Sequence, residues 1–182
     1  MSRYRRTHNK GTSYFFTVVT YRRQQILCDL QIRTALRQAI KTVREKYPFK
    51  IEAWVLLPDH LHCIWTLPPD DVNYSFRWGM IKRLVSRACA KDYKRHDWIN
   101  ASKRKYREST IWQRRYWEHQ IRNEQDFARH VDYIHYNPVK HGICNRVMDW
   151  PYSTFHREVA RGIYTEDWAG DKTKPVGGDF GE

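Results

Sequence analysis

The chain has 182 residues, with 33 Lys and Arg against 20 Asp and Glu and a formal net charge of +13 at pH 7. This length suits one well-buried domain, and contents of 41% hydrophobic and 15% aromatic residues exclude a disordered chain. The positive charge favours a polyanionic partner, because each neutralised phosphate releases counterions. A basic surface without such a partner is the alternative.

Cysteine spacing and the N-terminal sequence bear on the compartment. The four cysteines (28, 63, 89 and 144) form no C-x-x-C pair, which argues against a zinc knuckle and predicts a reducing cytoplasm. The basic N-terminus lacks the apolar segment of a secretion signal. No run of about 18 apolar residues is present, so we expect no membrane-spanning helix.

The first half of the chain reads as strand, helix, strand, strand. Residues 13–21 are rich in β-branched and aromatic residues and predict a strand. Asp29 can cap a helix with a 3.6-residue apolar repeat that stops before Pro48. Residues 50–57 and 60–67 predict two strands, and the short "PD" turn between them predicts an antiparallel hairpin.

The second half adds a helix over 75–94, a loop over 95–111, a strand over 111–121 and a helix over 124–137, with Gly142 as a stop signal. The whole order predicts an α+β fold: an antiparallel sheet with helices on one face, of the ferredoxin-like class. We expect a domain over 1–144, an aromatic C-terminal extension over 145–170 that packs on the domain or on DNA, and a disordered tail over 171–182.

A His-x-His pair lies in the third strand. Residues i and i+2 of a strand point to the same face, so His60 and His62 are predicted to lie side by side. Two such imidazoles can share a divalent ion and leave coordination positions for other ligands. The alternative is a half-exposed strand with two solvated histidines.

The last predicted helix carries a polar stripe. Asp126, His130, Tyr133 and Asn137 fall on one side of it, next to an apolar stripe that can pack on a sheet. Tyr133 is then either a functional residue or a boundary residue of the core. Asn137 precedes Pro138, which disfavours helical geometry and places Asn137 in the last turn or just outside it.

These residue types suit one reaction. A tyrosine hydroxyl can attack a DNA phosphodiester, form a phosphotyrosine link and release a 3′-OH, so that the bond energy is kept for rejoining. A divalent ion would polarise a phosphate oxygen. An amide oxygen is a suitable third ligand for Mg²⁺ or Mn²⁺ beside two imidazoles.

Three blocks of the sequence resemble the REP-associated tyrosine transposases, bacterial relatives of the single-tyrosine HUH transposases of insertion sequences. The blocks are His60-Leu61-His62, "HVDYIHYNPVKHG" (130–142) and "DWPYSTFHREVARGIYTEDWAG" (149–170). The pair alone is a weak signal, whereas the three blocks in order are specific and the resemblance covers about residues 1–171.

The resemblance implies a ferredoxin-like HUH nuclease fold and Mg²⁺- or Mn²⁺-dependent cleavage and rejoining of single-stranded DNA. The implied substrates are repetitive extragenic palindromes folded as hairpins. By the same resemblance, His60 and His62 are metal ligands and Tyr133 is the nucleophile. Tyr136 is a rival by proximity, but it falls off the helical stripe that carries Tyr133. Asn137 matches a third ligand that is usually Gln in insertion-sequence relatives, and the shorter side chain has less reach. His130 is either a supporting residue of this site or a packing residue.

Basic residues predict a path for DNA. Residues 77–115 hold Lys or Arg at thirteen positions against three acids, and the N-terminus adds a basic arm. Backbone contacts from these residues would position a strand. Trp112 is either a base-stacking platform or a core residue. The candidate DNA-binding residues are Arg3, Arg5, Arg6, Lys10, Lys82, Arg83, Arg87, Trp112, Arg114 and Arg115.

The leading interpretation is therefore a DNA nuclease and strand transferase of the bacterial cytoplasm, associated with the nucleoid and acting as a monomer or homodimer. A DNA-hairpin-binding protein without turnover is the alternative, and an RNA-binding protein is a weaker third. The set of His60, His62, Tyr133 and Asn137 favours catalysis, because a binding protein has no need of it.

Overall fold

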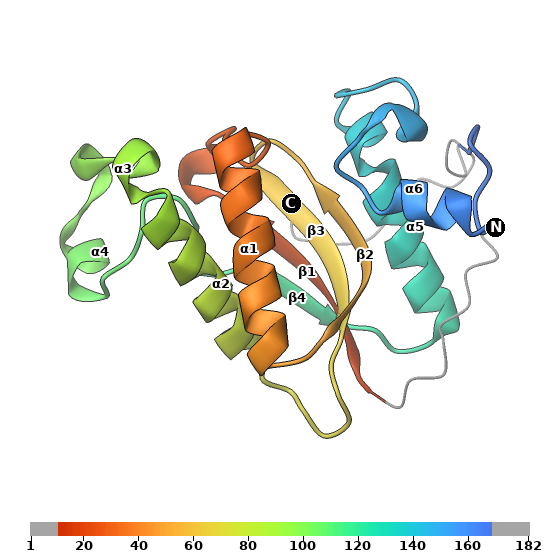
Figure 1. The fold of residues 1–182 in the computed structure, drawn as a ribbon, viewed down its shortest axis with the longest axis horizontal. Helices are drawn as coiled ribbons and strands as arrows, with labels where there is room; N and C mark the ends of the chain where they lie inside the picture. The colour runs from red at the N-terminus through yellow and green to blue at the C-terminus, as the bar shows by residue number, and fades with distance from the viewer. Residues whose placement is uncertain (1–10, 169–182) are drawn as a thin grey trace.

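The computed structural model describes residues 11–168. The fold has a four-stranded sheet between two layers of helices (Figure 1). The strands are β1 (Ser13–Val19), β2 (Lys50–Leu56), β3 (His60–Thr66) and β4 (Trp117–Gln120), and the α-helices are α1 (Leu30–Lys46), α2 (Tyr74–Ala88), α3 (Ala90–Tyr93), α4 (Ala101–Lys105), α5 (Glu124–Lys140) and α6 (Phe155–Ala160). None of the helices in this part of the chain is long and apolar enough to cross a membrane.

The sheet has the strand order β2-β3-β1-β4, and each neighbouring pair is antiparallel. Together with the chain order β1-α1-β2-β3-α2-β4, this confirms the ferredoxin-like α+β fold and the hairpin of β2 and β3. The central pair runs in register from Ser13 opposite Thr66 to Val19 opposite His60. The predicted histidine pair therefore lies on a central strand, where both neighbours hold its backbone.

Helices α1 and α2 cover one face of the sheet (Figure 1). The buried positions of α1 are Ile32, Leu36, Ala39 and Val43, the repeat that predicted this helix. The odd-numbered residues of β3 point toward these helices. Among them, Trp65 stacks on Trp78 of α2 with ring centroids 4.2 Å apart.

Helix α5 packs on the opposite face of the sheet. Its apolar stripe of Phe127, Val131 and Ile134 is buried with Phe15 and Ile64 from the two central strands. The predicted layer of helices on one face of the sheet thus consists of α1 and α2. Helix α5 forms a further layer on the other face. Because all residues of β1 and β3 are buried, both faces of these strands need a cover.

The segment between the second helix and the fourth strand differs from its prediction. The expected single helix ends at Ala88 and restarts at Ala90, and the expected loop over 95–111 contains α4 and a short 3-10 turn at His96–Trp98. The fourth strand spans Trp117–Gln120, and ahead of it Trp112 forms an isolated antiparallel bridge with Thr20. Polar and basic residues dominate this segment, so hydrophobic periodicity carries little signal there.

The C-terminal end of α5 lies beyond its predicted position. The helix continues through Pro138 to Lys140, and Gly142 follows with a φ of 66°. Pro138 stands in the last turn, where the N–H of His141 still bonds to the carbonyl of Asn137 at 3.0 Å. The pre-proline preference is thus outweighed by the burial of this turn.

The segment after α5 closes the outer edge of β2. Ser153 forms an isolated antiparallel bridge with Val55, and Thr154 exchanges hydrogen bonds with the backbone of Trp54. Phe155 and Tyr164 bury their rings in the same core as α5. This segment thereby covers the outer edge of β2, whose backbone groups would otherwise be unpaired there. The tail predicted over 171–182 lies outside the described residues.

His135 predicts how stability depends on pH. It is fully buried on α5, and burial, with a smaller effect of Arg157 and His156, lowers its pKa to about 3. In the unfolded chain the His135 imidazole has a pKa of about 6.5 and binds a proton below that pH, whereas in the folded chain it stays neutral until the pH approaches 3. The free energy of unfolding therefore falls as the pH drops from 6.5 toward 3. We expect a loss on the order of 3 kcal/mol at pH 4 from this residue.

Urea unfolding of the wild type and of His135→Leu at pH 7 and pH 4 measures this effect. The variant loses the hydrogen bond between Nε2 and the Thr154 hydroxyl at both pH values, but it has no ring to protonate. Its stability should therefore fall less between the two pH values. An equal fall in both proteins would show that His135 does not cause the loss.

Candidate active site

His60 and His62 are buried on the face of the sheet that α5 covers. They are 2% and 0% exposed, and their ring centroids lie 4.9 Å apart. The alternative of two solvated histidines is excluded by this burial. Two buried imidazoles side by side are the arrangement expected of a shared ion.

One nitrogen of each ring is held by a neighbouring side chain. Nδ1 of His60 lies 2.6 Å from Oδ1 of Asp59, and Nδ1 of His62 lies 2.8 Å from Oγ1 of Thr17. When Nδ1 donates in both bonds, the lone pair of each ring is on Nε2. Metal-binding histidines usually have such a partner, which sets the tautomer and the orientation of the ring. These residues therefore fit a divalent ion.

Asp59 is an anion in this arrangement. Its burial would raise the pKa of the carboxyl, but hydrogen bonds and charge interactions with His60 and Arg23 outweigh burial and lower the pKa to about 2. The carboxylate thus stays ionised at neutral pH and can accept a hydrogen bond from Nδ1 of His60.

Tyr133 faces the histidines from α5. Its side chain is 3% exposed, and its ring centroid lies 5.2 Å from that of His62. Lys140 donates a hydrogen bond from Nζ to the hydroxyl of Tyr133 at 3.2 Å. The helix thus places a phenol oxygen next to a cation and beside the histidine pair.

Asn137 and His141 continue this side of α5. Asn137 is fully buried one turn after Tyr133, within the helix. The ring of His141 lies 5.2 Å from that of His60. The sequence interpretation missed His141, although the spacing of four from Asn137 was visible, because the helix was predicted to end at Asn137.

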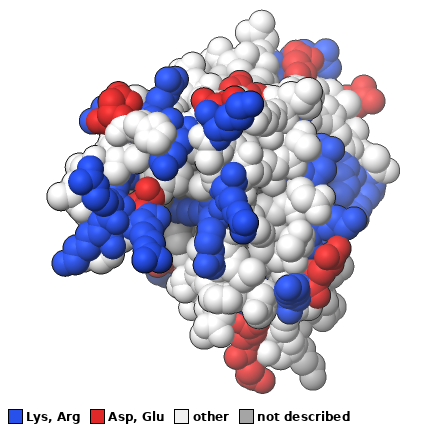
Figure 2. Space-filling model, turned by 60° about the vertical axis from the view of Figure 1, so that its left-hand side comes forward, with Lys and Arg blue, Asp and Glu red and all other residues white. Residues whose placement is uncertain are grey.

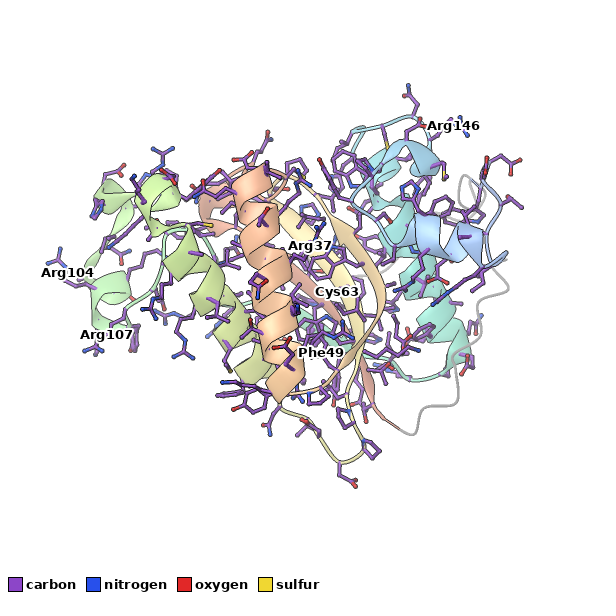
Figure 3. All side chains as sticks on the ribbon, viewed as in Figure 1. Arg37, Phe49, Cys63, Arg104, Arg107 and Arg146 are labelled. Carbon is purple, nitrogen blue, oxygen red and sulfur yellow. The ribbon has the colours of Figure 1, made fainter. Side chains whose placement is uncertain are left out.

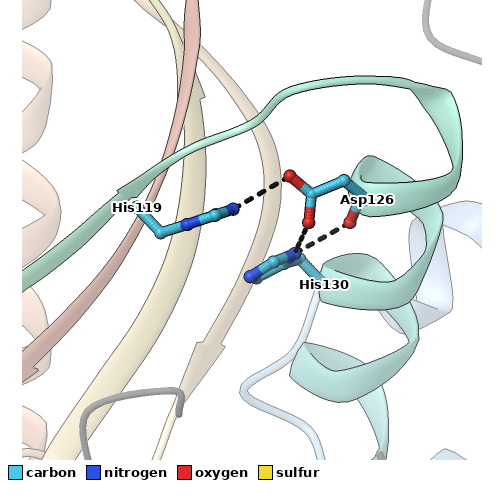
Figure 4. A group of neighbouring side chains, drawn as sticks. All are labelled: His119, Asp126 and His130. Carbon is cyan, nitrogen blue, oxygen red and sulfur yellow. Dashed lines mark hydrogen bonds and ion pairs between the residues drawn. The ribbon is translucent and has the colours of Figure 1, made fainter. Parts of the chain in front are cut away.

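His130 stands one turn before Tyr133 and contacts a different group. Its Nδ1 lies 2.8 Å from the backbone carbonyl of Asp126, and its ring stacks on that of His119 with centroids 4.7 Å apart (Figure 4). The ring of Phe15 lies 4.8 Å from His130 and 5.5 Å from His62. Phe15 therefore lies between this group and the histidine pair.

The predicted DNA-binding residues have mixed positions. Arg3, Arg5, Arg6 and Lys10 lie outside the described residues. Among the others, Arg83, Arg87 and Arg115 are exposed, and the exposed Arg114 pairs with Glu108.

Two of the candidates point inward instead. The core alternative holds for Trp112, which is 5% exposed and packs under α2. Burial lowers the pKa of Lys82 to about 8, and its ammonium donates to the carbonyl of Gln113 at 3.0 Å. Spacing in sequence does not distinguish a base that points inward from one that meets solvent.

Many of the exposed bases come from the segment between Arg83 and Arg115. Figure 2 shows Lys and Arg side chains over the side that carries α3 and α4, and Figure 3 shows Arg104 and Arg107 directed outward there. The exposed bases of this basic surface are Arg83, Arg87, Lys91, Lys94, Arg95, Arg104, Lys105, Arg107, Arg114 and Arg115. Such a surface attracts a polyanion.

Comparison with known proteins finds a transposase family and similar transposases. The family described as "Transposase IS200 like" matches residues 9–137. The chain is 49% identical to the REP-associated tyrosine transposase of Escherichia coli (strain K12) over 173 residues, 95% of this chain and 94% of the relative. A relative from Haemophilus influenzae is 46% identical over 180 residues, 99% of this chain and 100% of that one. A solved structure of a REP-associated tyrosine transposase bound to a REP hairpin matches with a TM-score of 0.75 and 49% identity, covering 96% of this chain and 95% of the other.

Proposed function

The chain belongs to the IS200-like transposase family, and on that premise we propose that it cleaves and rejoins single-stranded DNA at hairpins of repetitive extragenic palindromes through a 5′-phosphotyrosine link. The observation that carries this proposal is the meeting of two distant segments. The ring of Tyr133 lies 5.2 Å from that of His62, which comes from a different element 71 positions earlier in the chain.

His60, His62 and Asn137 are the residues that would hold Mg²⁺ or Mn²⁺. The bound ion would polarise a non-bridging oxygen of the scissile phosphate and offset the charge that develops at phosphorus. Asp59 and Thr17 support this role, because they hold Nδ1 of the two rings. The side chain of Asn137 is shorter than that of a Gln, but it is buried on the same side of α5 as Tyr133.

Tyr133 is the proposed nucleophile. Its hydroxyl oxygen bonds to phosphorus while the bond from phosphorus to the 3′ oxygen breaks; the phenol loses its proton and the leaving oxygen gains one to become a 3′-OH. The ammonium of Lys140 at 3.2 Å favours the phenolate that this step requires. Attack by a 3′-OH on the phosphotyrosine reverses the bond changes and rejoins a strand.

The proposed partner is a DNA hairpin, because the structural relative is bound to a REP hairpin. The basic surface would contact its phosphates, and binding should weaken steeply with salt for that reason. We further propose a cytoplasmic, nucleoid-associated protein that acts as a monomer or homodimer, with residues 1–144 as the nuclease unit and 145–170 as its extension.

Incubation of the full chain with a labelled hairpin oligonucleotide and Mg²⁺ tests the proposal. We expect a covalent protein–DNA adduct on a denaturing gel, and we expect EDTA to prevent it. Tight binding by gel shift at low salt without any adduct or cleaved strand would contradict the proposal and favour a hairpin-binding protein without turnover.

A further inference from the structure

A second group of metal-ligand side chains lies on the same face of the sheet, outside the histidine pair. It consists of His119 on β4 and of Asp126 and His130 on α5 (Figure 4). The ligand atoms of the three residues all lie within 4.8 Å of one another. Nε2 of His119 is 2.9 Å from one carboxylate oxygen of Asp126, and Nδ1 of His130 is 3.1 Å from the other.

The ring geometry brings both nitrogens to one carboxylate. The two imidazoles are stacked nearly parallel, at an interplanar angle of 13°. Asp126 and His130 are four residues apart on one helix, which places their side chains on the same side. Two imidazoles and one carboxylate on a single face of an ion form a known ligand set for divalent transition metals, with the other positions left to water.

We propose that His119, Asp126 and His130 bind a divalent transition-metal ion such as Zn²⁺, at a site separate from His60 and His62. Bond lengths of about 2.0–2.2 Å require the three ligand atoms to close in by a fraction of an ångström to about one ångström. His119 is on the short edge strand β4 and is 21% exposed, so its ring can make this adjustment and solvent can reach the site.

The chemistry of the present contacts is compatible with an ion. Burial lowers the pKa of His130, which favours the neutral form of its ring. To bind an ion, the proton on each ring nitrogen that faces Asp126 moves to the other ring nitrogen by exchange with water. Nδ1 of His130 then gives up its hydrogen bond to the backbone carbonyl of Asp126. Oδ2 of Asp126 also accepts a bond from the backbone N–H of Arg122 at 2.9 Å, which anchors the carboxylate while Oδ1 binds the ion.

The alternative is a hydrogen-bonded link that only joins β4 to the first turns of α5. The two readings differ in the number of ions bound. We expect equilibrium dialysis against Zn²⁺, followed by metal analysis, to give two ions per chain for the wild type. The double variant His119→Ala/His130→Ala should bind one, His60→Ala/His62→Ala should also bind one, and the fourfold variant should bind none.

His96→Ala is the matched control, because His96 is an exposed histidine in a short 3-10 turn outside both groups. It should still bind two ions. Asp126→Asn keeps the shape of the link but weakens the ligand set, and we expect its second Zn²⁺ to bind at least about tenfold more weakly. This variant keeps the test valid if the double alanine variant does not fold.

The proposal is overturned if the wild type binds a single ion that is insensitive to the change at His119 and His130, or if Asp126→Asn leaves both affinities unchanged. An ion lost equally in His96→Ala would identify adventitious surface binding and overturn it as well. The count of two ions also rests on the proposed metal site at His60 and His62, and failure of that site removes only the ion that depends on this pair. The proposed reaction itself is judged by adduct formation at Tyr133 and not by zinc stoichiometry.

Discussion

Tyr133→Phe should abolish the covalent protein–DNA adduct and lower cleavage of a hairpin oligonucleotide by about a thousandfold or more, because no other atom of the ring can attack phosphorus. The change removes one oxygen from a buried ring that packs against Phe15 and His62. It also removes the hydrogen bond that Nζ of Lys140 donates to the Tyr133 hydroxyl, which should cost on the order of 1 kcal/mol of stability at most. Hairpin binding measured by gel shift should therefore stay within about twofold of the wild type.

Tyr136→Phe is the matched control for this experiment. Tyr136 is three residues later on the same helix and is partly buried in the core under α5. It should form the adduct at the wild-type rate. An adduct that persists in Tyr133→Phe and is lost in Tyr136→Phe would reverse the assignment of the nucleophile.

His62→Ala should lower the affinity for Mn²⁺ by about a hundredfold or more and abolish cleavage at low millimolar metal, because it removes one of two imidazole ligands. His62 is fully buried between Thr17, Phe15 and Tyr133, so the variant also leaves a cavity. Urea unfolding without metal must accompany the assay, since a loss of about 2–4 kcal/mol from the cavity is expected.

Thr17→Val separates the two effects of that change. It keeps the volume of the side chain but removes the oxygen that holds Nδ1 of His62. Loss of such a partner typically weakens metal binding by about 10–100-fold. We expect Mn²⁺ affinity and cleavage to fall together by that amount, and excess Mn²⁺ to restore cleavage. Full Mn²⁺ affinity in both Thr17→Val and His62→Ala would refute the proposed metal site.

Much of the fold follows from patterns that are local in the chain. The alternation in residues 60–66 placed the two histidines on one side of a strand, and the 3.6-residue repeat placed α1 and the stripe of α5. These predictions depend only on backbone periodicity and on burial of apolar side chains. The basic segment from 95 to 111 has no such repeat, and its helix α4 was missed there.

The support of the candidate site was not predictable in the same way. Thr17 lies 45 positions from His62, and the pairing of β1 with β3 in this register brings them to 2.8 Å. His119 and His130 come from different elements, and the pairing of β4 with β1 together with the packing of α5 on Phe15 brings them together. Such contacts depend on strand order and helix placement, which no local pattern encodes.

Residue type and a spacing of two established that His60 and His62 share a face, because the pleat of a strand has a period of two. That this face is buried, lies under α5 and meets Tyr133 at 5.2 Å was decided by tertiary packing. The apolar stripe of α5 can only be buried against the sheet face that α1 and α2 leave open, and this packing brings the tyrosine to the histidines.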